Sequence, residues 1–155
     1  PRACREASAN GGVRIQTLAS MLDAASGAIV ATFGALHALF TFRGPRLLPR
    51  DDALRTRMQE VSPVITRETT MWKAWLGFNA SHGLGLVLFG VLYAWLALAH
   101  GALLFGSAFL LTLGFAALCA WVVLAKLYFF SVPLRGVVVA TVLYVVGVLA
   151  SRYAG

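Results

Sequence analysis

Residues 72–130 read WKAWLGFNASHGLGLVLFGVLYAWLALAHGALLFGSAFLLTLGFAALCAWVVLAKLYFF and contain two long apolar tracts in succession. The tracts cover about residues 72–99 and 102–130, with only His100 and Gly101 between them. A helix needs about 20 mostly apolar residues to cross the hydrocarbon core of a bilayer, and each tract exceeds that length. The pair therefore predicts two membrane-spanning helices joined by a tight turn, which makes them an antiparallel hairpin.

Two further apolar tracts flank this hairpin, at about residues 16–42 and 134–150. Pro133 precedes the last tract directly and suits the first turn of a helix, where its missing N–H costs no hydrogen bond. An isolated strand would leave its backbone groups unpaired in hydrocarbon, so each tract is expected to be a helix. The predicted fold is all-α: an integral membrane four-helix bundle over residues 15–155, after a polar flexible tail at residues 1–14.

Composition agrees with lipid as the surrounding solvent. Of the 155 residues, 59% are apolar and 12% are charged, whereas a soluble domain has roughly 25% charged residues. The formal net charge is +7, but the basic residues lie beside the apolar tracts, where orientation and anionic lipid explain them. We therefore expect membrane lipid as a partner and no nucleic acid. Cys4 and Cys119 lack CxxC spacing, so they indicate neither a redox pair nor a zinc knuckle, and no metal site is predicted from the cysteines.

Basic residues are distributed unequally between the two predicted sides of the membrane. Nine belong to the side with the long loop and the third turn. They are Arg43, Arg46, Arg50, Arg55, Arg57, Arg67, Lys73, Lys126 and Arg135. The other side has four, which are Arg2, Arg5, Arg14 and Arg152. The positive-inside rule then predicts a multi-pass protein whose long loop is cytoplasmic and whose two termini are outside.

The long polar loop, at residues 43–70, contains the pattern of a short helix. Asp51 and Asp52 follow Pro49, and acidic residues favour a helix N-terminus. Apolar residues then recur at helical spacing, at Leu54, Met58, Val61 and Ile65. The pattern predicts a short amphipathic helix lying at the cytoplasmic membrane interface. The alternative is a solvated helical linker, because the apolar stripe is narrow.

Polar residues within the tracts indicate a possible site, because burying them in a membrane is costly. His37 lies near the cytoplasmic end of the first tract, and Asn79 and His82 share a face of the second. The three are expected to meet in a polar pocket with Arg43, Arg67 and Glu68 at its mouth. Three interpretations remain open: hydrogen bonding that joins the helices, a pocket for a lipid or small molecule, and a metal or haem site. We expect no cofactor.

Two further expectations concern the helix surfaces. Gly77, Ser81 and Gly85 form a ladder of small residues at four-residue spacing, which predicts a close helix–helix contact. Asp23 lies near the outer end of the first tract and is expected to be hydrated there.

The block from Ala38 to Gly90 resembles a family of small uncharacterised bacterial membrane proteins with four predicted transmembrane helices. The matching residues include Thr41-Phe42-Arg43-Gly44, Pro49-Arg50-Asp51, Ser62-Pro63, Thr66 to Lys73, Trp75, Gly77-Phe78-Asn79, Ser81-His82, Gly85 and Leu88-Phe89-Gly90. The resemblance implies the four-helix topology and a bacterial cytoplasmic (inner) membrane, and it implies no role for any residue.

Two functions are compatible with these features. The first is a non-enzymatic small membrane protein, either an accessory subunit or a module that binds lipid or another apolar ligand, with other membrane subunits or a second copy as further partners. The alternative is a membrane-embedded enzyme, of isomerase or reductase type, that acts on a lipid-soluble substrate. It would use His82 and Glu68 as acid–base groups.

Overall fold

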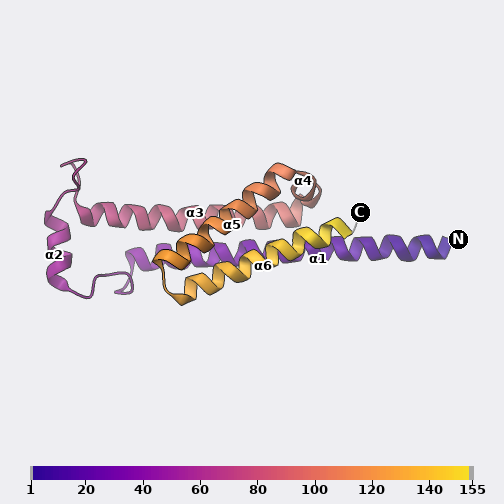
Figure 1. Cartoon of the computed structure of the whole chain (residues 1–155), viewed down its shortest axis with the longest axis horizontal. Helices are drawn as coiled ribbons and strands as arrows, with labels where there is room; N and C mark the ends of the chain where they lie inside the picture. The colour runs from indigo at the N-terminus through magenta and orange to yellow at the C-terminus, as the bar shows by residue number, and fades with distance from the viewer. Residues whose placement is uncertain (1, 154–155) are drawn as a thin grey trace. The chain divides into compact units, whose positions relative to one another are not determined.

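The computed structural model describes the backbone of residues 2–153 and the side chains of residues 11–153 (Figure 1). Every regular element in this part of the chain is a helix. The helices are α1 (Arg2–Phe42), α2 (Asp52–Glu60), α3 (Met71–Ala99), α4 (Gly101–Gly106), α5 (Ala108–Tyr128) and α6 (Ser131–Tyr153). The predicted all-α class is therefore confirmed. The tail predicted at residues 1–14 falls mostly on residues whose side chains lie outside the described part.

Four of the helices are long and apolar enough to cross a membrane. The qualifying segments are Gly11–Phe42, Met71–Ala99, Ala108–Tyr128 and Ser131–Tyr153. The shortest has 21 residues, which corresponds to about 32 Å of helix, close to the ~30 Å hydrocarbon core of a bilayer. The chain is thus a multi-pass membrane protein with four spanning helices, as predicted.

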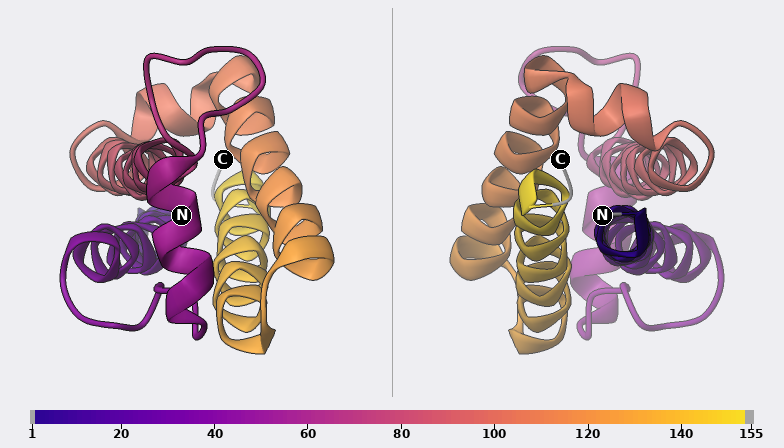
Figure 2. Two further views of the ribbon diagram at one scale, coloured as in Figure 1. Left: turned by 90° about the vertical axis from the view of Figure 1, so that its left-hand side faces the viewer. Right: turned by 90° about the vertical axis from the view of Figure 1, so that its right-hand side faces the viewer.

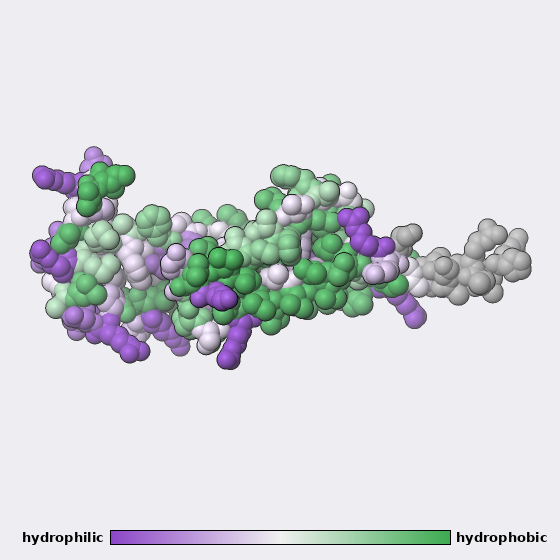
Figure 3. All heavy atoms as spheres, viewed as in Figure 1, coloured by the Kyte–Doolittle hydropathy of each residue, from purple (hydrophilic) through white to green (hydrophobic). Residues whose placement is uncertain are grey.

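The surfaces of these helices are apolar, as a lipid solvent requires. Large side chains such as Phe78, Phe109 and Leu127 are exposed along them. On the face drawn in Figure 3, hydrophobic residues cover much of the long helices, and hydrophilic residues lie around α2 and in a few other places. Contiguous exposed apolar surface of this extent indicates a membrane rather than water as the neighbour.

The chain forms two compact units. The four-helix unit consists of Pro1–Ala31 and Leu88–Gly155 and is named for the spanning helices α1, α3, α5 and α6. It contains α5, α6, parts of α1 and α3, and the short helix α4. The loop unit consists of Thr32–Val87, and contains α2 and the remaining parts of α1 and α3.

Two tyrosines hold the core of the four-helix unit together. Tyr93 of α3 and Tyr144 of α6 are both buried. Their hydroxyl groups donate hydrogen bonds to backbone carbonyl oxygens in the first turn of α5, at Leu110 (2.8 Å) and Leu111 (2.9 Å). Gly114 makes room for both rings, since a Cβ there would lie 2.6 Å from the Tyr144 hydroxyl oxygen. The hydrogen bond from Tyr144 joins α6 to α5, and these two helices lie side by side (Figure 2).

The tract predicted as one helix over residues 102–130 is divided into α4 and α5. The break is at Ser107, whose backbone is extended, with φ −100° and ψ 105°. The Ser107 hydroxyl oxygen accepts a hydrogen bond from the Leu110 N–H at 3.3 Å, which is the usual role of an N-cap serine. The apolar residues on both sides of Ser107 hide this break from a hydropathy pattern.

In the loop unit, α1 and α3 approach each other closely at glycines. A Cβ at Gly34 would lie 2.7 Å from the Gly83 carbonyl oxygen, and one at Gly83 would lie 3.0 Å from the Ala38 nitrogen. The glycines are therefore required for this contact, because any side chain would separate the backbones. The close helix contact was expected from small residues on α3, and it is present, but on another face of that helix.

The expected ladder of Gly77, Ser81 and Gly85 is exposed. A Cβ added at Gly77 or at Gly85 would meet nothing within 4 Å among the residues that the structure describes. Gly83 lies two residues from Ser81 and from Gly85, which is a rotation of about 200° around the helix. The structure therefore assigns the contact between α1 and α3 to the opposite side of α3.

The short helix predicted in the long loop is α2. The Asp51 carboxylate caps it by accepting hydrogen bonds from the backbone N–H groups of Ala53 (2.8 Å) and Leu54 (3.3 Å). The helix ends at Glu60, directly before the residues Val61 and Ser62 that lead to Pro63.

Candidate functional site

The structure brings together the three polar residues that the sequence indicated. His37 of α1 and Asn79 of α3 form a hydrogen bond, with 3.0 Å between His37 Nε2 and Asn79 Oδ1. The rings of His37 and His82 meet edge to face, with 5.0 Å between their centroids and 78° between their planes. All three residues are partly buried in the loop unit. We call them the polar trio.

The hydrogen bonds of Asn79 determine which nitrogen of His37 carries a proton. Asn79 Nδ2 donates to the carbonyl oxygen of Trp75 at 2.8 Å. Asn79 Oδ1 is an acceptor, so His37 Nε2 must be the donor. In a neutral imidazole, Nδ1 of His37 then has no hydrogen of its own and is an acceptor.

The polar trio is a direct contact between side chains. The described residues contain no group of three or more His, Cys, Asp or Glu side chains that could hold a metal ion. The Thr41 hydroxyl donates to the His37 carbonyl oxygen at 2.8 Å, and Thr41 is buried. This geometry supports the interpretation in which His37 and Asn79 join the helices, since each uses polar groups that would otherwise be unpaired.

The other predicted site residues lie on the loop. Arg43, Arg67 and Glu68 are exposed. The Glu68 backbone N–H donates to the hydroxyl oxygen of Thr66 at 3.1 Å. Of these three residues, Arg43 contributes to a cavity, which is formed by the last turn of α1 and the first residues of the loop.

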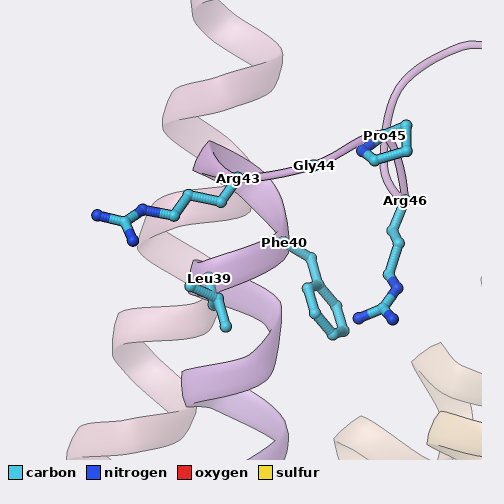
Figure 4. Close-up of a pocket in the computed structure, with 6 residues that line it drawn as sticks. All are labelled: Leu39, Phe40, Arg43, Gly44, Pro45 and Arg46. Atoms are coloured by element: carbon cyan, nitrogen blue, oxygen red, sulfur yellow. The ribbon is translucent and has the colours of Figure 1, made fainter.

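This cavity has a volume of about 560 Å³. It is lined by Leu39, Phe40, Arg43, Gly44, Pro45 and Arg46 (Figure 4). Gly44 has a φ of +85°, a left-handed conformation that residues with a side chain rarely adopt, and it turns the chain away from α1. The cavity is largely open, so a ligand there would be only partly enclosed. We call it the loop cavity.

The side chains of Arg43 and Arg46, which both line the loop cavity, point in different directions. Arg46 lies over the ring of Phe40, with 4.3 Å from its guanidinium carbon to the ring centroid. Figure 4 shows Arg43 extending away from Phe40 and Arg46. Among the described side chains, the one ion pair is between Arg57 and Glu60, at 3.2 Å. No acidic side chain in that part therefore neutralises Arg46.

The structure contradicts the prediction for the surroundings of Asp23. It was expected to be hydrated, but its side chain is only 1% exposed. The reason is that α6 packs against this part of α1: a Cβ on Gly147 would lie 2.5 Å from Asp23 Oδ1, so α6 covers the carboxyl group. Ser26, one turn further along, is also buried. One feature of the sequence does indicate this burial, because Asp23 and Ser26 lie on one face of an apolar helix.

Comparisons of the chain with protein-family profiles, with curated proteins and with solved structures find no match. The resemblance described for residues 38–90 is therefore not supported as family membership. The four apolar helices that it implies are present.

Proposed function

We propose that this chain is a non-enzymatic membrane protein that binds an anionic phospholipid in the loop cavity. The phosphate of the headgroup contacts Arg46, and the upper part of an acyl chain lies against Leu39 and Phe40. In this proposal the membrane is a bacterial inner membrane, the cavity faces its cytoplasmic leaflet and both termini are outside.

The observation that carries the proposal is the combination of an apolar wall with an unneutralised guanidinium. Leu39 and Phe40 belong to the last turn of a membrane-spanning helix, and Arg46 follows in the loop. A phospholipid presents the same order of chemistry at the membrane interface, with acyl chain first and phosphate next. Arginine suits this role because its planar guanidinium binds phosphate oxygens in pairs.

The charge of the loop favours an anionic headgroup over a neutral one. The segment from Arg43 to Lys73 contains seven basic and four acidic residues, a net charge of +3. Each basic residue near an anionic leaflet contributes about 1 kcal/mol of attraction. The loop therefore draws anionic lipid to the side of the membrane that the positive-inside rule assigns to it.

Apolar residues of the loop support its position at the lipid surface. Leu54 on α2 is exposed, and so are Val64 and Ile65, which follow α2 and Pro63. Exposed apolar side chains among arginines are typical of segments that lie in the headgroup region. In this position, α2 keeps the loop flat against the membrane and the cavity open to lipid.

The polar trio has a supporting role in this proposal. His37 precedes Leu39 by two residues, so its hydrogen bond to Asn79 holds the end of α1 against α3 beside the cavity. The acid–base alternative gains no support, because Glu68 is exposed on the loop.

Native mass spectrometry of the full chain, released from detergent with a defined lipid, tests the proposal. The probes are a phosphatidylglycerol and a phosphatidylcholine with the same acyl chains. We expect phosphatidylglycerol to bind more tightly and Arg46→Gln to weaken it about tenfold, since a charge-assisted hydrogen bond contributes about 1.5–3 kcal/mol.

The matched control is Arg50→Gln, which removes the same charge from an exposed position four residues further along the loop. It should change the affinity less than about twofold, because it removes only long-range attraction. The proposal would be overturned if Arg46→Gln and Arg50→Gln bound phosphatidylglycerol with equal affinity. It would also be overturned if the wild type bound phosphatidylglycerol and phosphatidylcholine equally.

A further inference from the structure

Asp23 is a carboxyl group buried in the core of the four-helix unit. Its side chain is 1% exposed. Within the described residues, neither Oδ1 nor Oδ2 has a hydrogen-bond partner. A buried polar group is normally paired, so an unpaired one inside a membrane protein indicates a function rather than a packing role.

The position of Asp23 is well inside a spanning helix. It lies in the segment Gly11–Phe42, opposite Gly147 of α6. Gly147 is six residues from the end of α6 at Tyr153, which corresponds to about 9 Å of helix. Ala19, one turn before Asp23, is also fully buried. The carboxyl group is thus surrounded by protein at a depth where lipid, not water, surrounds the helices.

The contact between Asp23 and α6 is tight. A Cβ on Gly147 would lie 2.5 Å from Asp23 Oδ1 and 3.0 Å from the Ala19 carbonyl oxygen. The backbone of α6 therefore occupies the space in front of the carboxyl group. A metal ion with its shell of about six oxygen ligands needs that space, whereas a proton does not.

The titratable groups around Asp23 do not include a counter-ion. Tyr144 of α6 interacts with it electrostatically, and Tyr93 of α3 lies beside Tyr144. Both phenols donate their hydrogens to carbonyl oxygens of α5. The basic side chains that the structure describes in this unit are all exposed. They are Arg14, Lys126, Arg135 and Arg152, and the imidazole of His100 is exposed as well.

We propose that Asp23 is an intramembrane proton-binding site whose occupancy controls the contact between α1 and α6. With its proton, the carboxyl group is neutral and α6 packs on it at Gly147. Without the proton, an anion with no donor would face a backbone, and hydrating it requires α6 to move away from α1. This site is independent of lipid binding at the loop cavity.

Infrared spectroscopy of the full chain in dodecyl maltoside micelles, which have no ester carbonyl, tests whether Asp23 holds a proton. At neutral pH we expect a carbonyl stretching band of a neutral carboxylic acid in the wild type. The band should be absent in Asp23→Asn and retained in Asp51→Asn, whose carboxylate is an exposed helix cap. No neutral-acid band in the wild type at neutral pH would overturn the proposal, and that result needs no variant to fold.

Amide hydrogen exchange tests the coupling. After correction for intrinsic base catalysis, the exchange of α6 amides near Gly147 should rise at least tenfold between neutral and strongly alkaline pH in the wild type. In Asp23→Asn, which has the same shape and cannot lose a proton, the corrected rate should stay constant. The same alkaline rise in both proteins would show that Asp23 does not control the contact.

Discussion

The side chains of His37 and Asn79 are joined by a hydrogen bond of 3.0 Å, although 42 residues separate them in the chain. The bond connects α1 to α3 inside the loop unit. Asn79 also donates to the Trp75 carbonyl oxygen, so its amide is held in one orientation and presents Oδ1 to His37. The polar trio is therefore a fixed connection between two apolar helices.

The hydrogen bond between His37 and Asn79 should contribute a measurable interaction energy to the stability of the protein. We expect a double-mutant cycle of His37→Ala and Asn79→Ala to give about 0.6 kcal/mol, the average for hydrogen bonds between membrane helices, and at most about 1.7 kcal/mol. The free energy of unfolding in mixed detergent micelles is the measurement. A parallel cycle of His37→Ala with Ser81→Ala should give almost no coupling, because Ser81 is exposed on α3. Equal coupling in the two cycles would contradict the contact.

Two glycines that are two residues apart on α3 should respond in opposite ways to the same substitution. Gly83→Leu should destabilise the protein by about 2 kcal/mol or more, since its side chain would enter the contact with Gly34 and Ala38. Gly85→Leu should be neutral or stabilising by up to about 1 kcal/mol, because leucine favours a helix and nothing lies within 4 Å of the added Cβ. Thermal unfolding in one detergent compares the two variants. The opposite order would place the contact on the face that the sequence pattern indicated.

The Tyr144 hydroxyl should contribute to the stability of the four-helix unit. Tyr144→Phe keeps the ring and leaves the Leu111 carbonyl oxygen without this donor. We expect a loss of about 1 kcal/mol in the free energy of unfolding. Tyr153→Phe is the control, because Tyr153 is 83% exposed at the end of α6. A loss as large in Tyr153→Phe would show that the effect does not come from the buried hydrogen bond.

The cap of α2 should control local opening of the loop. Asp51→Ala removes the acceptor for the N–H groups of Ala53 and Leu54, and loss of such a cap costs about 1 kcal/mol. Amide exchange over α2 should therefore accelerate about fivefold. Asp52→Ala removes an acidic residue from the same turn, and its smaller effect should reflect the helix dipole alone. If both variants exchange equally fast, the Asp51 hydrogen bonds do not hold the helix.

Sequence patterns predicted the elements of this fold well, because hydrophobic length and charge are local properties. The four spanning helices and the short helix after Asp51 follow from spacing along single helices. The meeting of His37 with Asn79 follows from the similar depths of these residues in two helices that are joined on the same side. The division at Ser107 did not, since one serine with apolar neighbours changes hydropathy very little. Its capping role depends on the backbone angles that the surrounding helices impose.

The faces of the helices were harder to predict than their lengths. Gly77, Ser81 and Gly85 form a regular ladder, but Gly83 makes the close contact, because α1 has its own glycine opposite Gly83. That complementarity depends on two helices at once and is absent from either pattern alone. The burial of Asp23 also depends on α6, whose Gly147 covers it.

The crossing of a bilayer by four helices underlies every inference about lipid and buried polar groups. Single cysteines placed in a chain with Cys4→Ser and Cys119→Ala, and labelled with a membrane-impermeant maleimide from each side in turn, test it most directly. We predict that Ser62→Cys reacts only from the cytoplasmic side, His100→Cys only from the outer side, and Phe115→Cys from neither. Reaction of Ser62→Cys and His100→Cys from the same side, or ready labelling of Phe115→Cys from water, would contradict it.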